Sequence, residues 1–219
     1  MMRGDFLMSK IKAILFDMDG VLIEAKDWHY EAMNKALKLF GMEISRYDHL
    51  VTYDGLPTRK KLEMLSIERG LPKPLHQFID TMKQQYTMEI VYAQCKPRFY
   101  HEYALARLKK EDYRMAVCSN SVRNSIEMMM QKACLEKYFD FYVSNQEVLH
   151  GKPNPEMYIK AIEKMGLSPD ECLILEDNEN GIKAALASGA HLLKIETVED
   201  VNYENIKNRI LQIEKDGHD

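Results

Sequence analysis

The first apolar run of the chain, residues 11–16, consists largely of branched and aromatic side chains. A run this short favours a strand that is buried on both faces, and the breaker Gly20 ends the segment. Asp17 and Asp19 therefore stand at the carboxyl end of the strand. Ligands bind at that end of an open parallel sheet, so we expect both acids at the mouth of a crevice. An Asp-Gly turn with two solvated acids fits the same residues.

Beyond the first strand, the residues between 24 and 94 follow helical spacing. A stripe with spacing i, i+3, i+4, i+7 predicts one helix, with Asp27 as its N-cap and Gly41 as its stop. A second helix is expected from Pro57 to Gly70, with leucines 62 and 65 inward. The stripe of the first helix is Met33, Ala36, Leu37 and Phe40, and a third helix, from about Pro74, turns inward Leu75, Phe78, Ile79, Met82, Tyr86 and Ile90.

From residue 96 onward, strands and helices alternate. Strands are expected at 115–118, 141–143, 172–175 and 192–195, and helices near 100–110, around 126–130, at 155–165 and at 181–188. This alternation indicates βαβ units, and hence an α/β fold with a Rossmann-like parallel sheet. We expect residues 1–24 and 95–219 to form the core domain, with an inserted all-α cap at 25–94. The last strand is expected to precede a polar tail.

Composition narrows the classes of partner. The 34 acidic and 30 basic residues give a net charge of −4, which argues against a nucleic-acid-binding surface. No apolar stretch approaches the roughly 18 residues that span a bilayer, and residues 1–8 lack the apolar core of a signal peptide. We expect a cytoplasmic protein without a membrane partner. Met8 is an alternative start, and the residues before it are expected to be frayed.

The cysteines give no sign of a metal site or a disulfide framework. Their spacing shows no C-x-x-C pair, and two of them lie within apolar strand-like runs. We interpret all of them as reduced core residues of an intracellular protein. They are Cys95, Cys118, Cys134 and Cys172.

Polar motifs follow three later strands as well. Ser119 and Asn120 come directly after one strand, where a hydroxyl and free backbone N–H groups can receive phosphate oxygens. An ordinary helix cap has the same pattern. Lys152 lies in a proline-stiffened turn between Gly151 and Pro153, which holds its ammonium in one direction. A single loop lysine is often only solvated.

A second acidic pair, Glu176 and Asp177, closes another strand. Carboxylate oxygens are ligands that Mg2+ prefers, so Asp17 and Asp177 could share one such ion. A cluster of caps and turns would look similar locally. Polar motifs at four strand ends are hard to attribute to caps alone.

Taken in order, these four motifs resemble those of the haloacid dehalogenase superfamily, over nearly the whole chain. The match is closest to the branch with a helical cap after the first motif, which includes β-phosphoglucomutase and phosphoglycolate phosphatase-like enzymes. The resemblance implies that Asp17 is a nucleophile that forms an aspartyl phosphate. It implies that Asp19 is the general acid and base, and that its backbone carbonyl helps to hold the metal.

The same resemblance assigns the remaining motif residues. Ser119, Asn120 and Lys152 would bind the phosphoryl oxygens. Mg2+ would be held by Asp17, Asp19 and Asp177, with Glu176 acting directly or through a water. Dehalogenases lack an acid at the position of Asp19, because a halide needs no proton. Phosphoryl transfer is therefore favoured.

Substrate choice is expected to lie in the cap. His29 is a candidate contact in the first turn of the first cap helix, and a solvated histidine at a helix end fits the same position. Thr58 stands where the mutase has an arginine, and Arg59 comes one residue later, a shift that could turn its guanidinium away from the cleft. The neighbouring Lys60 and Lys61 are interpreted as a solvated basic face.

Lys83 is offset from a cap lysine of the mutase, which weakens the mutase reading. We therefore expect a Mg2+-dependent phosphatase of a small phosphorylated metabolite, with a monomer plausible. A β-phosphoglucomutase-type mutase is the alternative, and an inactive binding protein is a weaker third.

Overall fold

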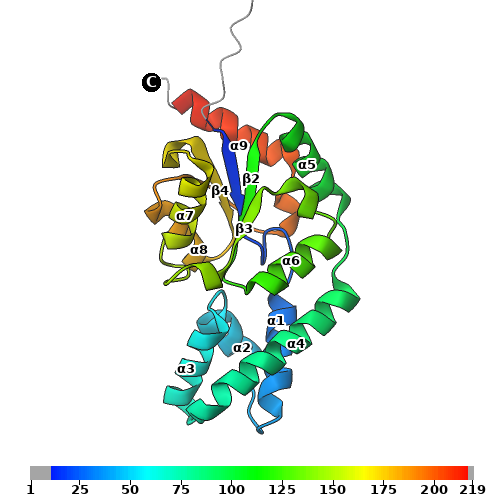
Figure 1. Cartoon of the computed structure of the whole chain (residues 1–219), viewed down its shortest axis with the longest axis vertical. Coiled ribbons are helices and arrows are strands. Elements are labelled where there is room, and N and C mark those ends of the chain that lie inside the picture. Colours follow the sequence, from blue (N-terminus) through cyan, green and yellow to red (C-terminus); the bar gives the residue numbers. More distant parts are fainter. Residues whose placement is uncertain (1–10, 217–219) are drawn as a thin grey trace, which may run out of the picture.

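The structure, a computed structural model of the chain, describes residues 11–216, so the segment 1–8 that we expected to be frayed lies outside it. Five parallel strands of the described residues form one sheet in the order β3-β2-β1-β4-β5 (Figure 1). The strands are β1 (Ala13–Phe16), β2 (Arg114–Cys118), β3 (Phe141–Val143), β4 (Cys172–Glu176) and β5 (His191–Lys194). The predicted parallel α/β sheet is confirmed, with β5 starting one residue earlier than expected.

The central strand β1 is apolar on both faces because helices cover both sides of the sheet. Ile14 and Phe16 point into one apolar layer, whereas Ala13 and Leu15 point into the other. The first layer includes α5 (Phe99–Lys110), α6 (Arg123–Lys132) and α9 (Tyr203–Asp216), and the second includes α7 (Glu156–Met165) and α8 (Glu179–Ala187). The two layers leave the ends of the strands as the part of the sheet that can host a site.

The helix α9 corrects the expected polar tail. Its buried residues Ile206, Ile210 and Ile213 recur with helical spacing and pack into the first apolar layer. Most residues between these isoleucines are charged or carry an amide. The segment is therefore polar in composition, and only the spacing of the isoleucines indicates a buried face. The chain therefore ends its described part with a packed amphipathic helix.

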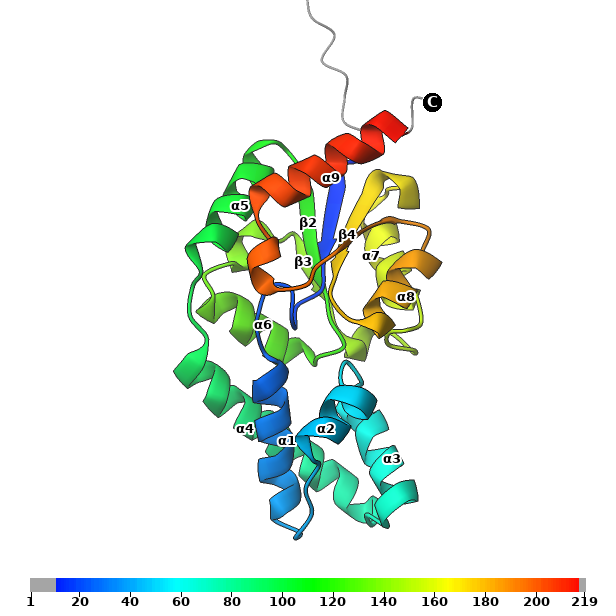
Figure 2. The same cartoon turned by 180° about the vertical axis from the view of Figure 1, so that it is seen from behind.

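Four helices and a short π-helical turn lie beyond the carboxyl ends of the strands (Figure 2). They are α1 (Lys26–Lys38), α2 (Arg46–Asp48), the turn His49–Tyr53, α3 (Thr58–Arg69) and α4 (His76–Gln94). They enclose an apolar core of their own, which includes Met33, Leu37, Tyr53, Leu62, Leu65 and Ile79. The expectation of an all-helical segment here matches these elements.

Details of this helical segment differ from the expectation. Asp27 is not an N-cap, because α1 already begins at Lys26, and its carboxylate pairs with Arg46 instead. Phe78 is half-exposed and meets Phe40 edge to face on the surface of α4. The buried face of α4 instead contains Lys83, a residue that apolar patterning passes over.

The cysteine prediction holds for three of the four residues. Cys95, Cys118 and Cys172 are buried free thiols, whereas Cys134 is exposed. Cys134 lies in the turn after α6, where its backbone has a positive φ of 59°. Within residues 11–216, no helix has the length and apolar character needed to cross a membrane.

Candidate active site at the carboxyl ends of the strands

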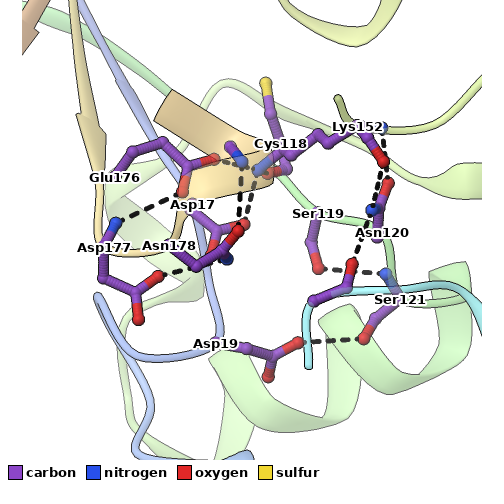
Figure 3. A network of polar contacts seen from close by, with 12 residues as sticks. Asp17, Asp19, Cys118, Ser119, Asn120, Ser121, Lys152, Glu176, Asp177 and Asn178 are labelled. Carbon is purple, nitrogen blue, oxygen red and sulfur yellow. Dashed lines mark hydrogen bonds and ion pairs between the residues drawn. The ribbon is translucent and has the colours of Figure 1, made fainter. Parts of the chain in front are cut away.

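The segments that follow β1, β2, β3 and β4 bring their polar side chains into one buried cluster (Figure 3). The Lys152 ammonium donates to Asp17 Oδ1 at 2.6 Å, to Glu176 Oε1 at 2.6 Å and to the Cys118 carbonyl at 2.8 Å. The strand order explains this convergence, because the chain leaves β1 toward β2 on one side and returns to β4 on the other. The cluster thus occupies the switch point of the sheet.

Charge in this cluster is unevenly matched. Burial and the nearby Glu176 carboxylate raise the pKa of Asp17, and the Lys152 ammonium only partly opposes them. Burial alone would lower the pKa of Lys152, but the attraction of Asp17 and Glu176 outweighs burial and raises it. Lys152 therefore stays charged, and all its N–H donors are used by named acceptors. Its carboxylate partners retain an excess of negative charge.

Tyr158 contacts this cluster, and the sequence did not predict its role there. Its phenol, on the buried face of α7, donates to Glu176 Oε1 at 2.5 Å, and its ring centre lies 4.8 Å from the Lys152 nitrogen. On the opposite side, a Cβ at Gly181 would lie 2.0 Å from the Glu176 carboxyl group. Glu176 is therefore fixed by a phenol, an ammonium and a glycine that leaves room for it.

The acids at this edge fit a divalent metal. Asp17, Glu176 and Asp177 each offer a carboxylate oxygen, and these oxygens lie within 4.8 Å of one another. Hard oxygen donors of this kind suit Mg2+. One oxygen of each carboxylate is already engaged, since Glu176 Oε1 and Asp17 Oδ1 accept from Lys152 and Asp177 Oδ2 pairs with Lys26.

Asp177 is held in place by its surroundings. Its Oδ2 lies 2.7 Å from Lys26 Nζ, a cation that the sequence analysis did not single out. Burial raises the pKa of Asp177, while the hydrogen bond from Lys26 opposes that rise. Gly20 has a φ of +89°, and a Cβ there would approach Asp177 Oδ2 to 2.1 Å. Glycine is thus required at this turn both by its backbone and by its neighbour.

Asp19 faces a different set of groups. Its Oδ2 accepts from the Ser121 hydroxyl at 3.1 Å, and its Oδ1 lies 3.1 Å from His29 Nε2. Lys83 Nζ lies 3.3 Å from His29 Nδ1, where an ammonium can only donate, so the ring proton belongs on Nε2, facing Asp19. Burial alone would raise the pKa of Asp19, but His29 and Lys83 outweigh it and lower that pKa. The Asp19 carboxylate therefore stays ionised, and its contacts are separate from the cluster of Asp17, Glu176 and Asp177.

The residues after β2 play two different parts. Ser119 is buried, and its hydroxyl accepts from the Ser121 N–H at 3.1 Å. The Asn120 side chain donates to the Gly55 carbonyl at 3.0 Å and accepts from the Lys152 N–H at 3.0 Å. Asn120 thus joins a loop of the helical segment to the lysine loop. Neither residue caps α6, because the N-cap there is Val122.

A comparison with known families decides where this chain belongs. The model of the family described as "Haloacid dehalogenase-like hydrolase" matches residues 14–195. The chain belongs to this family. The resemblance drawn from the four motifs is thereby confirmed, and the chain is an enzyme of the haloacid dehalogenase-like hydrolases.

Similar proteins of known sequence carry phosphatase names. The hydrolase is 26% identical to the "Phosphorylated carbohydrates phosphatase" of Thermotoga maritima, over 82% of this chain and 82% of that protein. It is 28% identical to the "Phosphoglycolate phosphatase" of Aquifex aeolicus, again over 82% of each.

Solved structures show the same fold. A β-phosphoglucomutase from Clostridium difficile superposes with a TM-score of 0.80 at 19% identity, covering 92% of this chain and 98% of that one. CbbY from Rhodobacter sphaeroides, in complex with phosphate, gives a TM-score of 0.76 at 24% identity, with 84% and 85% covered. Both structures thus share the overall fold of the hydrolase.

One pocket of the hydrolase joins the acid cluster to the helical segment. Asp17, Asp19, Ser119, Asn120 and Lys152 line it from the strand ends, and His29, Thr58, Lys61 and Lys83 line it from the helices. The structure does not bring Arg59 into the pocket, because its side chain is 90% exposed and pairs with Glu63. Of the two lysines predicted to be solvated, Lys60 is exposed, but the prediction is wrong for the buried Lys61. A step of about 100° per helical residue separates the two directions.

Proposed function

We propose that this hydrolase is a Mg2+-dependent phosphatase of a small phosphorylated metabolite. The observation that carries the proposal is the arrangement of two carboxylates at one pocket. Asp17 is held by Lys152, whereas Asp19 is held separately by Ser121 and His29. The phosphatase names of similar proteins support the same reaction class. A nucleophile and a separate acid and base are what a two-step phosphoryl transfer needs.

In the first step, a carboxylate oxygen of Asp17 attacks phosphorus, and the bond to the leaving oxygen breaks. Lys152 holds Oδ1 of Asp17, while Oδ2 has no hydrogen bond to any residue that the structure describes. The leaving oxygen takes a proton from Asp19. A bound phosphate adds negative charge beside Asp19, which raises its pKa and favours the protonated form that this step requires.

In the second step, water attacks phosphorus of the aspartyl phosphate, Asp19 accepts a proton from the water, and the bond from phosphorus to the Asp17 oxygen breaks to release phosphate and the free carboxylate. The lowered pKa of Asp19 is then restored as phosphate leaves, which returns the site to its starting state. Ser119 and its neighbouring N–H groups would bind the phosphoryl oxygens, and the buried positive charge of Lys152 beside Asp17 would stabilise them although its N–H donors are already engaged. Asn120 would act by holding the lysine loop, since its side chain is engaged with backbone groups.

Mg2+ would be held by Asp17 and Asp177, by the backbone carbonyl of Asp19, and by Glu176 directly or through a water. When bound, the ion neutralises charge on the nucleophile and on the phosphoryl oxygens. The excess of carboxylate over ammonium in this cluster supports the assignment.

The helical segment would act as the cap. We propose that residues 25–94 form this domain, that 1–24 and 95–219 form the core, and that His29 and Thr58 contact the substrate. Both side chains line the pocket. The exposed position of Arg59 leaves it outside this set.

The test is release of phosphate from a panel of phosphomonoesters with Mg2+, by the wild type and by Asp17→Asn. We expect Mg2+-dependent phosphate release that Asp17→Asn abolishes, while the exposed Asp112→Asn behaves as wild type. Phosphate release by Asp17→Asn at the wild-type rate would rule out Asp17 as the nucleophile. Conversion of β-glucose 1-phosphate to glucose 6-phosphate without free phosphate, in the presence of a bisphosphate activator, would show a mutase instead.

A further inference from the structure

Two lysines line the helical wall of the pocket although they are buried. Lys61 on α3 is 9% exposed, and Lys83 on α4 is 8% exposed. Buried ammonium groups are rare in proteins unless an anion or several acceptors pair with them. Their position in the pocket thus calls for a partner.

The described part of the chain does not supply that partner. The Lys61 ammonium makes no hydrogen bond or ion pair with residues 11–216, and within the same residues the one polar contact of the Lys83 ammonium is with the uncharged acceptor His29 Nδ1. Lys152, by contrast, has three acceptors. His49 adds a third group, because its buried Nε2 lacks a hydrogen-bond partner and its side chain also lines the pocket. Polar groups with few or no partners among the described residues therefore gather on this wall.

The electrostatics agree with this geometry. Burial, and then the repulsion of Lys83, lower the pKa of Lys61 to about 8, although Asp54 and Asp19 pull the other way. Burial also lowers the pKa of Lys83. An anion placed between the two ammonium groups would relieve both effects.

Relying on the phosphatase activity proposed above, we propose that Lys61 and Lys83 bind a second anionic group of the substrate, either a carboxylate or a phosphate. The side of the pocket decides which part of the substrate carries it. Asp19 marks the leaving oxygen, and His29 with Lys83 lies next to Asp19 on the helical wall. The second anion therefore belongs to the alcohol that leaves.

This assignment names the substrate class. The phosphomonoester group lies against Asp17, and the alcohol bears a carboxylate or a second phosphate that reaches Lys61 and Lys83. A neutral alcohol would leave both buried ammonium groups without a compensating anion. Doubly anionic substrates should therefore be preferred in kcat/KM.

The first experiment uses wild-type enzyme and two matched pairs of substrates. The pair 3-phosphoglycerate and glycerol 3-phosphate tests a carboxylate, and the pair fructose 1,6-bisphosphate and fructose 6-phosphate tests a second phosphate. We expect kcat/KM to favour the doubly anionic member by about tenfold or more in at least one pair. Equal values within both pairs would overturn the subsite while leaving the phosphatase intact. No hydrolysis of any phosphomonoester would instead overturn the proposed function.

The second experiment assigns the preference to the lysine. In Lys61→Met, the ratio of the two kcat/KM values in the favoured pair should fall by roughly 10- to 100-fold. Lys60→Met is the matched control, since Lys60 is the exposed neighbour on the same helix, and its ratio should stay at the wild-type value. Lys61→Arg keeps the charge and should retain most of the preference. An unchanged ratio in a folded Lys61→Met, or a ratio lost equally in Lys61→Arg, would contradict the assignment.

Discussion

The ammonium of Lys152 lies 2.6 Å from a carboxylate oxygen of Asp17 and 2.6 Å from one of Glu176. All three side chains are buried, so water can replace neither partner. Replacing this lysine with methionine leaves two carboxylates facing each other in the interior. Removing one partner of a buried ion pair is strongly destabilising, because it leaves an uncompensated charge.

For Lys152→Met, we therefore expect the free energy of unfolding to fall by about 3–5 kcal/mol, measured by urea denaturation. Phosphate release should fall by at least about 100-fold, since Asp17 loses both its orientation and the cation beside it. Lys183→Met serves as control, because Lys183 lies on α8 with its side chain 59% exposed. Wild-type stability in Lys152→Met would show that the three groups do not act as a unit.

The separate position of Asp19 predicts a dependence on the leaving group. In Asp19→Asn, kcat/KM for an alkyl phosphate such as glycerol 3-phosphate should fall by about 100- to 10,000-fold, because the alkoxide needs a proton. With p-nitrophenyl phosphate, whose leaving group needs none, the first step should survive. We expect a stoichiometric burst of nitrophenolate in stopped-flow measurements, followed by slow turnover. Equal losses on both substrates, without a burst, would argue against Asp19 as general acid.

The contact between Lys26 and Asp177 predicts competition with the metal. Lys26 Nζ lies 2.7 Å from Asp177 Oδ2, and the ammonium must give up this contact when a cation binds there. Lys26→Met should therefore bind Mg2+ more tightly, by a few-fold, because the lysine side chain is partly exposed and its charge is screened. Isothermal titration calorimetry measures this directly. Lys35→Met, on the same helix and paired with Glu31, should bind Mg2+ as wild type does. Weaker binding by Lys26→Met would contradict the prediction.

A buried histidine predicts loss of stability in mild acid. Burial lowers the pKa of His101 to about 4, and the side chain lies 2.8 Å from the Val198 carbonyl through Nε2. Below the ordinary histidine pKa of about 6.5, His101 binds a proton in the unfolded chain but stays neutral in the folded chain. The free energy of unfolding therefore falls as the pH falls. Between about pH 7 and pH 5, His101 should account for a loss of about 2 kcal/mol, as judged from urea denaturation. In His101→Gln, the loss in the free energy of unfolding between about pH 7 and pH 5 should be smaller by that amount. An equal loss in the variant and the wild type would refute the assignment.

Much of the core could be predicted because its strands are short apolar runs followed by polar residues. The positions of Asp17, Ser119, Lys152 and Asp177 at strand ends predict that these side chains converge. The parallel order of the strands brings the first three to one pocket and Asp177 next to Asp17. Strand ends are local signals, and the fold turns each of them into a shared location.

The missed residues share a different physical reason. Lys61, Lys83 and Tyr158 are polar groups on helix faces that turn inward, and apolar periodicity assigns such positions to solvent or overlooks their hydroxyl. Helix α9 was missed because its isoleucines are isolated among charged residues. In each case, burial depended on what another element placed opposite the side chain.

The bond between Asn120 and the Gly55 carbonyl has a mechanical consequence. The amide oxygen of Asn120 accepts from the Lys152 backbone N–H, and the amide nitrogen of the same side chain donates to the Gly55 carbonyl in the loop before α3. A displacement of that loop would pull on the amide and, through it, on the peptide that carries the ammonium next to Asp17. Opening of the pocket to a new substrate and a shift of the Lys152 ammonium relative to Asp17 would then occur in one motion rather than two.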